Sequence, residues 1–361
     1  MGNYRVYVYA ICKNERAFAA RWMQSMREAD GVYVLDTGST DGTPEALTEL
    51  GAQVTCEEIT PWRFDTARNR SLELVPADAD ICVCTDLDEY FTPGWREEVE
   101  SAWAEGAQQL RYPYVWSFNA DGSEGTFFYA DKMHARQGFE WIHPVHEVLR
   151  YTGGGEAQRA LCQGMRLEHH PDAQKSRAQY LPLLELAVRE SPDDARDLYY
   201  LGREYLFRRR WQDAEQMLLR HLAAPCATWR EERSAAMRGL ARAVLEQGRT
   251  KDAKSWLLRA AAEAPHLREP WVESAQLALR ENVWSGALYF AETALAIRER
   301  SRSYVNSADA WGALPHDLAA LGAYYLGLYD RALEHGRAAC ALAPQDARLQ
   351  ENLRFYEEKA H

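Results

Sequence analysis

A short apolar stretch runs directly into a cluster of acidic residues at positions 81–89. Ile81–Cys84 has the length and composition of a buried strand, and Asp86, Asp88 and Glu89 follow it at once. The apolar part has to be buried, whereas the acids need water, a metal or a partner. Both needs are met when the acids lie at the exposed end of a buried strand, where an open α/β sheet keeps its ligand site. We therefore expect this turn to hold a divalent cation and, through it, a diphosphate.

The first half of the chain alternates between strand-like and helical segments. Runs of β-branched and aromatic residues indicate strands, while apolar residues spaced three and four apart indicate helices. The expected strands cover residues 5–12, 32–35, 53–56 and 81–86. The expected helices between them cover residues 18–27, 43–50 and 66–74. This order predicts an α/β fold with a doubly wound, mostly parallel sheet. Later strands are expected at residues 109–118, 126–129 and 161–168.

Acidic residues recur in the loops that follow the predicted strands. In a parallel sheet these loops meet at one edge and form the crevice that holds a ligand. The acids in question are Glu15, Asp36, Asp41, Asp86, Asp88 and Glu89. Hard oxygen ligands of this kind suit Mn²⁺ or Mg²⁺. The sequence contains no GxGxxG motif, so the dinucleotide-binding version of the fold has no support.

From about residue 175 the sequence is helical and repetitive. Alanines that anchor the repeats recur 39, 34 and 45 residues apart, near the 34 of tetratricopeptide repeats with insertions: Ala214, Ala253, Ala287 and Ala332. Small residues at these positions let paired helices approach closely, and stacked pairs form an all-α solenoid with a concave groove. We therefore expect two domains, 1–172 and 173–361. The groove would take a peptide or protein acceptor, or form a homodimer surface. The alternative is a packing platform for the first domain.

The composition limits the cellular location and the binding partners that are expected for the chain. Its 361 residues include 54 acidic and 42 basic ones, a formal net charge of −12. This charge argues against non-specific binding to nucleic acid or to an anionic membrane. Seven cysteines without a paired motif indicate reduced thiols and a cytoplasmic protein. The longest apolar run near the start, Val6–Cys12, is far shorter than the ~18 residues that span a bilayer, so no membrane span is expected.

Four motifs follow one another in the first half. They are Cys12-Lys13-Asn14-Glu15, then DTGSTDGT at residues 36–43, then Ala67-Arg68-Asn69, then Asp86-Leu87-Asp88-Glu89. With these motifs, residues 4–172 resemble the family 2 glycosyltransferases of the GT-A fold. The whole chain is similar to the branch of that family with a tetratricopeptide tail, which includes glycosyltransferases that modify bacteriocin peptides. No QxxRW motif follows, which excludes a processive polymer synthase.

The resemblance implies a nucleotide-sugar site in the crevice, with a UDP-sugar as the expected donor. Asp36 and the end of the first strand would contact the nucleotide base, with Arg68 beside it. Asp86 would face the ribose or the metal. The full set of donor-site residues expected from the resemblance is Ala10, Ile11, Cys12, Asn14, Glu15, Asp36, Ser39, Arg68, Asp86, Leu87 and Asp88.

The resemblance also implies a metal shell and a catalytic base. Asp88, with Asp86, would ligate Mn²⁺ or Mg²⁺, and His169 or His170 near the end of the domain would complete the shell. One imidazole among oxygen ligands favours Mn²⁺. Glu147 would deprotonate the acceptor in an inverting transfer, a task worth roughly 10²–10⁴-fold in rate.

Structural roles are the alternatives for the same side chains. Asp86 and Asp88 could lie in a solvated turn before the next helix, and Asp36 could be the first residue of an Asx turn. Arg68 could pair with a surface acid, and Glu147 could be a structural carboxylate that holds a neighbouring histidine. The chain would then be a non-catalytic helical-repeat adaptor with a degenerate nucleotide-sugar domain.

Other acceptors and reactions also fit the sequence. The same enzyme class could act on a saccharide, a lipid-linked glycan or a modified nucleobase. A nucleotidyltransferase is disfavoured, because no glycine-rich phosphate loop with a lysine follows the first strand.

Overall fold

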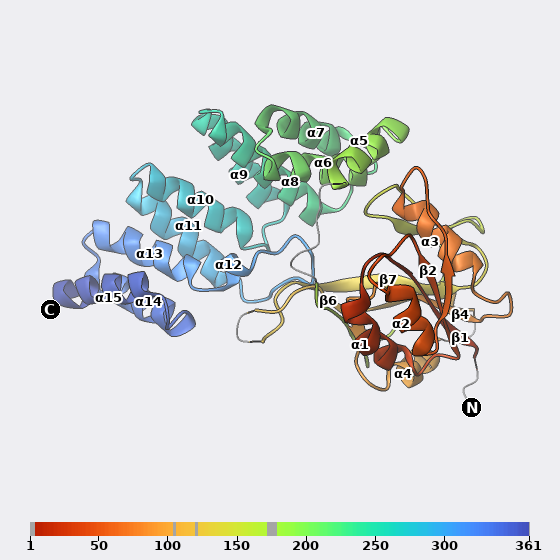
Figure 1. The fold of residues 1–361 in the computed structure, drawn as a ribbon. Helices are drawn as coiled ribbons and strands as arrows, with labels where there is room; N and C mark the ends of the chain where they lie inside the picture. The colour runs from red at the N-terminus through yellow and green to blue at the C-terminus, as the bar shows by residue number, and fades with distance from the viewer. Residues whose placement is uncertain (1–3, 104–105, 120–121, 172–178, 361) are drawn as a thin grey trace. The chain divides into compact units, whose positions relative to one another are not determined.

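The computed structural model describes residues 4–103, 106–119, 122–171 and 179–360. Two compact units make up the chain, Met1–Ala187 and Val188–His361 (Figure 1). The predicted boundary between residues 172 and 173 falls outside the described residues and stays a prediction. The first unit is built on a β-sheet and the second consists of helices, as the sequence pattern predicts.

A nine-stranded sheet forms the centre of the first unit. In spatial order its strands are β3 (Gln53–Cys56), β2 (Gly31–Asp36), β1 (Val6–Cys12), β4 (Ile81–Cys84), β7 (Phe127–Ala135), β6 (Gln109–Val115), β11 (Leu167–His169) and β5 (Glu89–Phe91), with β10 (Arg159–Leu161) beside β6. The first four strands of the chain are parallel neighbours, because helical connections return the chain to the same edge each time. β7 then joins β4 in the antiparallel direction.

Helices cover both faces of this sheet. The elements that pack on it are α1 (Arg16–Met26), α2 (Thr43–Glu49), α3 (Phe64–Glu73), α4 (Trp95–Ala102) and the hairpin of β8 (Phe139–Ile142) and β9 (Val148–Tyr151). Side chains alternate along β1, so Val8 and Ala10 pack with α1, α2 and α4. Tyr9 packs on the opposite face with α3 and Trp141. The predicted fold class, a doubly wound and mostly parallel sheet followed by an all-α repeat region, is confirmed.

The strand order reverses between β1 and β4. From β1 the chain moves outward through β2 and β3, and then crosses back to β4 on the other side of β1. Open α/β sheets bind their ligands at such a reversal, outside the carboxyl ends of the strands. Cys12 ends β1 and Cys84 ends β4, so the acidic turn that follows Cys84 lies at this point.

Some details of the predicted strands are wrong. Residues 161–168 do not form one strand, because β10 and β11 separately pair with β6, at Leu161 opposite Arg111 and Leu167 opposite Tyr114. Leu161 and Leu167 are six residues apart in the chain, whereas their partners Arg111 and Tyr114 are only three apart in β6. The surplus residues therefore leave the sheet. The strand expected to reach residue 86 ends at Cys84, since a turn closed by the Glu89 amide and the residue 86 carbonyl at 3.0 Å follows it.

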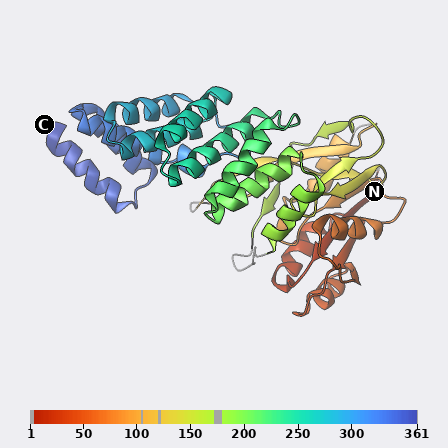
Figure 2. The same cartoon turned by 90° about the horizontal axis from the view of Figure 1, so that it is seen from above.

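The second unit is a series of antiparallel helix pairs (Figure 2). The pairs are α6 (Ala195–Phe207) with α7 (Trp211–Ala223), α8 (Arg230–Glu246) with α9 (Thr250–Glu263), α10 (Glu269–Arg280) with α11 (Trp284–Ala296), and α13 (Leu314–Tyr325) with α14 (Tyr329–Leu342). The remaining helices of this unit are α12 (Ala308–Trp311) and α15 (Ala347–Ala360), while α5 (Tyr180–Glu190) begins in the first unit and ends in the second. None of the described helices combines the length and apolarity needed to cross a bilayer.

The anchor alanines of the helical unit behave as the repeat pattern predicts. Ala214, Ala253, Ala287 and Ala332 are all fully buried. A Cβ on Gly202 would lie only 2.7 Å from Leu218 Cδ2, so α6 and α7 approach closely because this residue is glycine. The widest spacing, from Ala287 to Ala332, includes an irregular segment and α12 inserted between α11 and α13.

Candidate active site

The loops after β1 and β2 are held together by polar side chains. The Asn14 side-chain oxygen accepts a hydrogen bond from the Thr40 amide at 2.8 Å, and the Asn14 amide donates to Ser39 Oγ at 2.8 Å. Asp36 is buried, and its Oδ1 accepts from the amides of Gly38 and Ser39. Asp36 therefore shapes its own loop as an Asx turn. Its contact with a nucleotide base stays a prediction.

Several predicted donor-site residues have buried side chains, namely Ala10, Ile11, Cys12, Glu15 and Leu87. Ala10 and Ile11 belong to hydrophobic clusters on opposite faces of the sheet. Cys12 Sγ lies 3.3 Å from Asp36 Oδ2, and burial together with this carboxylate raises the pKa of the thiol. The side chains of Ala10, Ile11 and Leu87 are apolar and buried, so these residues would contact a ligand through their backbone atoms.

Arg68 joins two of the predicted site carboxylates. Its Nε donates to Glu147 Oε1 at 2.5 Å, and its Nη2 donates to Asp86 Oδ1 at 2.7 Å. The side chain is only 4% exposed and lies over the Trp141 ring, with 5.3 Å between Cζ and the ring centroid. Burial lowers the pKa of Arg68, but the negative charges of Asp86 and Glu147 outweigh it and raise the pKa. The structure thus brings Arg68, Asp86 and Glu147 together.

Lys132 and the buried position of Glu89 are two features of the site that were not predicted from the sequence. Lys132 Nζ lies 2.8 Å from Glu89 Oε1 and 3.6 Å from Asp86 Oδ2. Glu89 also accepts from the Tyr114 hydroxyl at 2.6 Å and from the Asp86 amide at 2.9 Å. Burial lowers the pKa of Lys132, but Glu89 and Asp86 raise it overall, so this side chain is a cation. A charged residue inside the largely apolar strand β7 is the signal that could have identified it.

Asp88 and His169 face each other across the crevice. His169 Nδ1 donates to the Trp116 carbonyl at 3.0 Å, and His169 Nε2 lies 3.5 Å from Asp88 Oδ2. Burial lowers the pKa of His169, but the hydrogen bond and charge of Asp88 raise it overall, so positive charge between the two groups is favoured. Metal-binding histidines commonly donate their second N–H to a carbonyl, and a carboxylate with an imidazole suits Mn²⁺. The donor set therefore fits a divalent cation.

The other two predicted metal ligands are placed differently. His170 Nε2 lies 3.3 Å from Glu168 Oε2, and its ring stacks on the Phe118 ring. The two carboxylate oxygens of Asp86 already face cationic side chains. The structure therefore brings the imidazole of His169 to the Asp88 carboxylate, whereas His170 contacts Asp88 through its backbone amide, which donates to the Asp88 carbonyl at 2.8 Å. The ligand roles themselves stay predictions.

A chain of directed hydrogen bonds holds the tryptophan beneath Arg68. Trp141 Nε1 donates to the Tyr9 hydroxyl at 2.8 Å, and this hydroxyl lies 2.7 Å from His134 Nε2. His134 Nδ1 lies 2.8 Å from the Ala135 carbonyl. Burial lowers the pKa of His134 to about 4, so the ring is neutral at pH 7. Because the Ala135 carbonyl only accepts, the single ring proton lies on Nδ1, and the Tyr9 hydroxyl donates to Nε2.

We expect the first unit to lose stability as the pH falls from 6.5 to 4. The folded pKa of His134 is about 4 and its ordinary value is 6.5, so the unfolded chain binds a proton in this window that the folded chain does not. The difference corresponds to about 3 kcal/mol of unfolding free energy, lost progressively as the pH falls. Pulse-labelling hydrogen exchange of β4 during urea titrations at pH 7 and pH 4.5 measures this loss.

His134→Gln should remove most of this pH dependence. His169 acts in the opposite sense, because its raised pKa adds stability at low pH that is lost as the pH rises through the folded pKa. The difference between the unmodified chain and His134→Gln therefore isolates His134. An equal pH dependence in both chains would contradict the assigned proton position.

Comparisons with known proteins bear on both halves of the chain. Residues 7–124 match the family described as Glycosyl transferase family 2. A TPR repeat-containing protein of Synechococcus elongatus is 31% identical over 115 residues, which cover 32% of this chain and 26% of that protein. The chain thus matches about a quarter of the length of this curated relative.

Two solved helical structures are similar to part of the chain. One is described as a functional characterization of Pseudomonas aeruginosa PilF, with 19% identity, 49% of this chain covered, 72% of that chain covered and a TM-score of 0.39. The other is PilW, a type IV pilus biogenesis factor, with 20% identity, 48% and 73% coverage and a TM-score of 0.40. Likenesses at this level carry no inference about function.

The match to the glycosyl transferase family covers the first part of the candidate site. It extends from β1 to the residues after β6 and includes the loops after β1 and β2, Arg68 and the acidic turn. Glu147 and His169 lie beyond it and come to the site through the fold. Residues 7–124 therefore match glycosyl transferase family 2, and the chain continues into a region of paired helices.

Proposed function

We propose that this chain is a metal-dependent, inverting glycosyltransferase that moves a sugar from a nucleotide sugar, UDP-linked, to an acceptor. The observation that carries the proposal is the meeting of Asp88 Oδ2 and His169 Nε2 at the reversal of strand order, beside the acidic turn. Mn²⁺ or Mg²⁺ held there would neutralise the charge that develops on the nucleoside diphosphate as the glycosidic bond breaks.

The residues around Asp86 support this proposal. Arg68 and Lys132 lie on either side of its carboxylate and fix its direction. A fixed carboxylate at this position can accept hydrogen bonds from the ribose hydroxyls of the donor. The loops held by Asn14 and Asp36 form the neighbouring wall, where the nucleotide base would lie.

Glu147 is the proposed catalytic base. Its Oε1 accepts the hydrogen bond from Arg68, and its Oε2 has no hydrogen-bond partner among the described residues. Oε2 is therefore the oxygen that would take the proton from the acceptor as the acceptor attacks the sugar. The bond to Arg68 fixes the direction of the carboxylate, which serves an in-line reaction.

For the acceptor we propose a peptide or protein, because a helical-repeat region follows the transferase domain in the same chain. A saccharide, a lipid-linked glycan or a modified nucleobase would be bound without help from this region. A homodimer through the helical region and a cytoplasmic location remain part of the proposal, and the seven free cysteines agree with a reducing setting.

A thermal-shift screen of nucleotide sugars with and without Mn²⁺ tests the donor and the metal together. We expect one UDP-sugar to raise the melting temperature, and to do so more strongly with Mn²⁺, because a ligand stabilises the state that binds it. Release of UDP during incubation with that donor separates an enzyme from a binding module. A shift without release, with acceptor peptides present, would favour the non-catalytic adaptor, and a response to none of the nucleotide sugars would refute both.

A further inference from the structure

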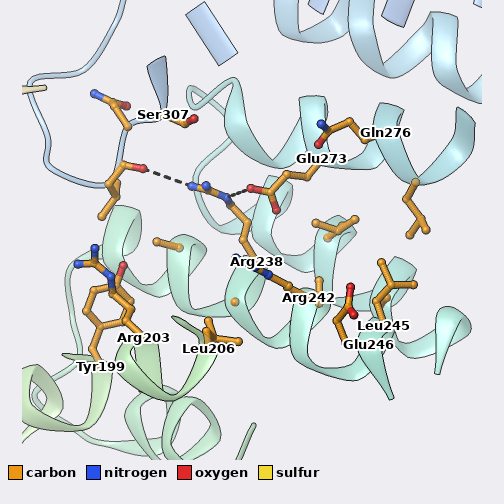
Figure 3. A pocket seen from close by; sticks show the side chains of 18 of the residues that line it. Tyr199, Arg203, Leu206, Arg238, Arg242, Leu245, Glu246, Glu273, Gln276 and Ser307 are labelled. Atoms are coloured by element: carbon orange, nitrogen blue, oxygen red, sulfur yellow. Dashed lines mark hydrogen bonds and ion pairs between the residues drawn. The ribbon is translucent and has the colours of Figure 1, made fainter. Parts of the chain in front are cut away.

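A groove of about 610 Å³ lies on one face of the helical unit (Figure 3). The first helices of three successive pairs, α6, α8 and α10, line it together with two residues of α9 and the segment 304–307. Because these helices belong to consecutive repeats, the groove crosses them one after another. This arrangement suits an elongated ligand.

Polar side chains line the groove at equivalent positions of consecutive repeats. Arg203, Arg242 and Gln276 each precede the anchor alanine of their repeat by 11 residues. A second polar side chain in each of these helices lies four residues away and also lines the groove: Tyr199, Arg238 and Arg280. Residues four apart share one face of a helix. Each of the three helices therefore presents two polar side chains to the groove.

Positive charge in this groove is only partly balanced. Arg238 pairs with Glu273 at 2.7 Å, and Figure 3 shows this pair within the groove. Arg203, Arg242 and Arg280 form no ion pair within the part of the chain that the structure describes. Arg203 and Arg242 each lie over aromatic rings, which hold the side chains in place while their N–H groups stay open to a ligand.

The chain's own segment 304–307 shows what this face binds. Arg238 Nη1 donates to the Val305 carbonyl at 3.4 Å, and the Ser307 amide donates to Glu269 Oε1 at 2.9 Å. The Tyr304 hydroxyl donates to the buried carboxylate of Glu232. Arg238, which lines the groove, thus holds a peptide carbonyl of a segment that is neither helix nor strand, and Glu269 and Glu232, which do not line the groove, hold other polar groups of the segment.

We infer that the groove binds an acidic peptide segment of another protein, with the carboxylates of the segment paired to Arg203, Arg242 and Arg280. The guanidinium groups offer several N–H donors each, in the geometry that carboxylates accept. The inference goes beyond the proposed sugar transfer and does not depend on it, because binding is measured without donor or metal.

A peptide fits this groove better than a nucleic acid does. Glu246 and Glu273 also line it, and they would repel the uniform charge of a phosphate backbone. A peptide can place its carboxylates at the arginines and neutral backbone groups near the two glutamates. The hydrogen bond from Arg238 to the Val305 carbonyl shows that a peptide group suits this face.

Fluorescence anisotropy on the full chain tests the inference. The probe is a labelled 12-residue peptide of alternating glutamate and serine, and the comparison peptide carries glutamine in place of every glutamate. We expect the acidic peptide alone to bind, and Arg203→Gln/Arg242→Gln to weaken its binding at least about tenfold, since two charge pairs are lost. Affinity should also fall as salt rises.

Arg259→Gln is the matched control. Like Arg242, Arg259 lies over a tryptophan ring, with 4.7 Å from Cζ to the centroid, but it does not line the groove. It should leave the affinity unchanged, and unchanged circular dichroism spectra would show that all variants fold. Equal binding of the glutamine peptide, an equal loss in Arg259→Gln, or tighter binding of a single-stranded oligonucleotide at the same salt would overturn the inference, as would no binding of the acidic peptide at all.

Discussion

Asp88→Asn is expected to lower the rate of UDP release from the donor about a thousandfold. Asparagine keeps the size of the side chain but removes the negative charge that faces His169 Nε2 at 3.5 Å. Loss of this ligand removes charge stabilisation worth several kcal/mol, and roughly 4 kcal/mol corresponds to a thousandfold in rate. UDP release is measured with and without Mn²⁺, and the thermal shift caused by Mn²⁺ alone gives a second readout that does not need activity.

Two comparisons make this result specific. Asp131→Asn removes a carboxylate of β7 that pairs with Arg111 at 2.6 Å away from the acidic turn, and it should leave UDP release unchanged. His169→Ala should abolish the thermal response to Mn²⁺, whereas His170→Ala should keep it, because His170 pairs with Glu168 instead. A full Mn²⁺ response in Asp88→Asn, or its loss in His170→Ala alone, would refute the proposed ligand pair.

The fold was largely predictable because its strands are governed by local pattern. The apolar runs of β1, β2, β3 and β4 can be buried only inside a sheet, and the helical spacing between them requires parallel neighbours. The anchor alanines likewise follow from repeat spacing, since close helix packing needs a small residue at each repeat. The break between β10 and β11 was not predictable, because it depends on how many residues β6 offers at that edge.

The candidate site was predictable where sequence position fixes spatial position. Asp86 and Asp88 follow a strand end, so their place at the crevice is set by the sheet. The choice between His169 and His170 also had a local signal. Leu167 is buried in the core, and residue 169 shares its side of β11 because side chains alternate along a strand.

Long-range partners could not be read from the sequence. Glu147 lies 79 residues beyond Arg68 in the chain. Their hydrogen bond forms because α3 and the β8 hairpin pack together on the same face of the sheet. Lys132 reaches Glu89 across 43 residues through the antiparallel strand β7. Neither distance is encoded by a motif, so the ion pairs that orient Asp86 become visible only in the folded chain.

Those ion pairs lead to the second large effect, which is expected for Arg68→Met. Methionine has a similar length but no charge, so Glu147 loses its partner while it stays mostly buried. Removing one partner of a buried ion pair costs about 3–5 kcal/mol of unfolding free energy. Asp86 contributes less to this cost, because it keeps Lys132 at 3.6 Å and is one-third exposed. Pulse-labelling hydrogen exchange of α3 and β4 during a urea titration measures the change in the first unit.

Arg70→Met is the matched control. Arg70 lies two residues after Arg68 in the same helix, α3, but it pairs with Glu57 and Glu73 at the surface. Its loss should have little effect, since exposed ion pairs contribute little to stability. Arg68→Met/Glu147→Gln should recover part of the stability lost in Arg68→Met, because the orphaned charge is removed as well. If Arg68→Met were no less stable than Arg70→Met, the buried cluster would not hold the first unit together. If the double variant regained stability but not UDP release, the pair of Arg68 and Glu147 would be needed for the reaction and not for the fold alone.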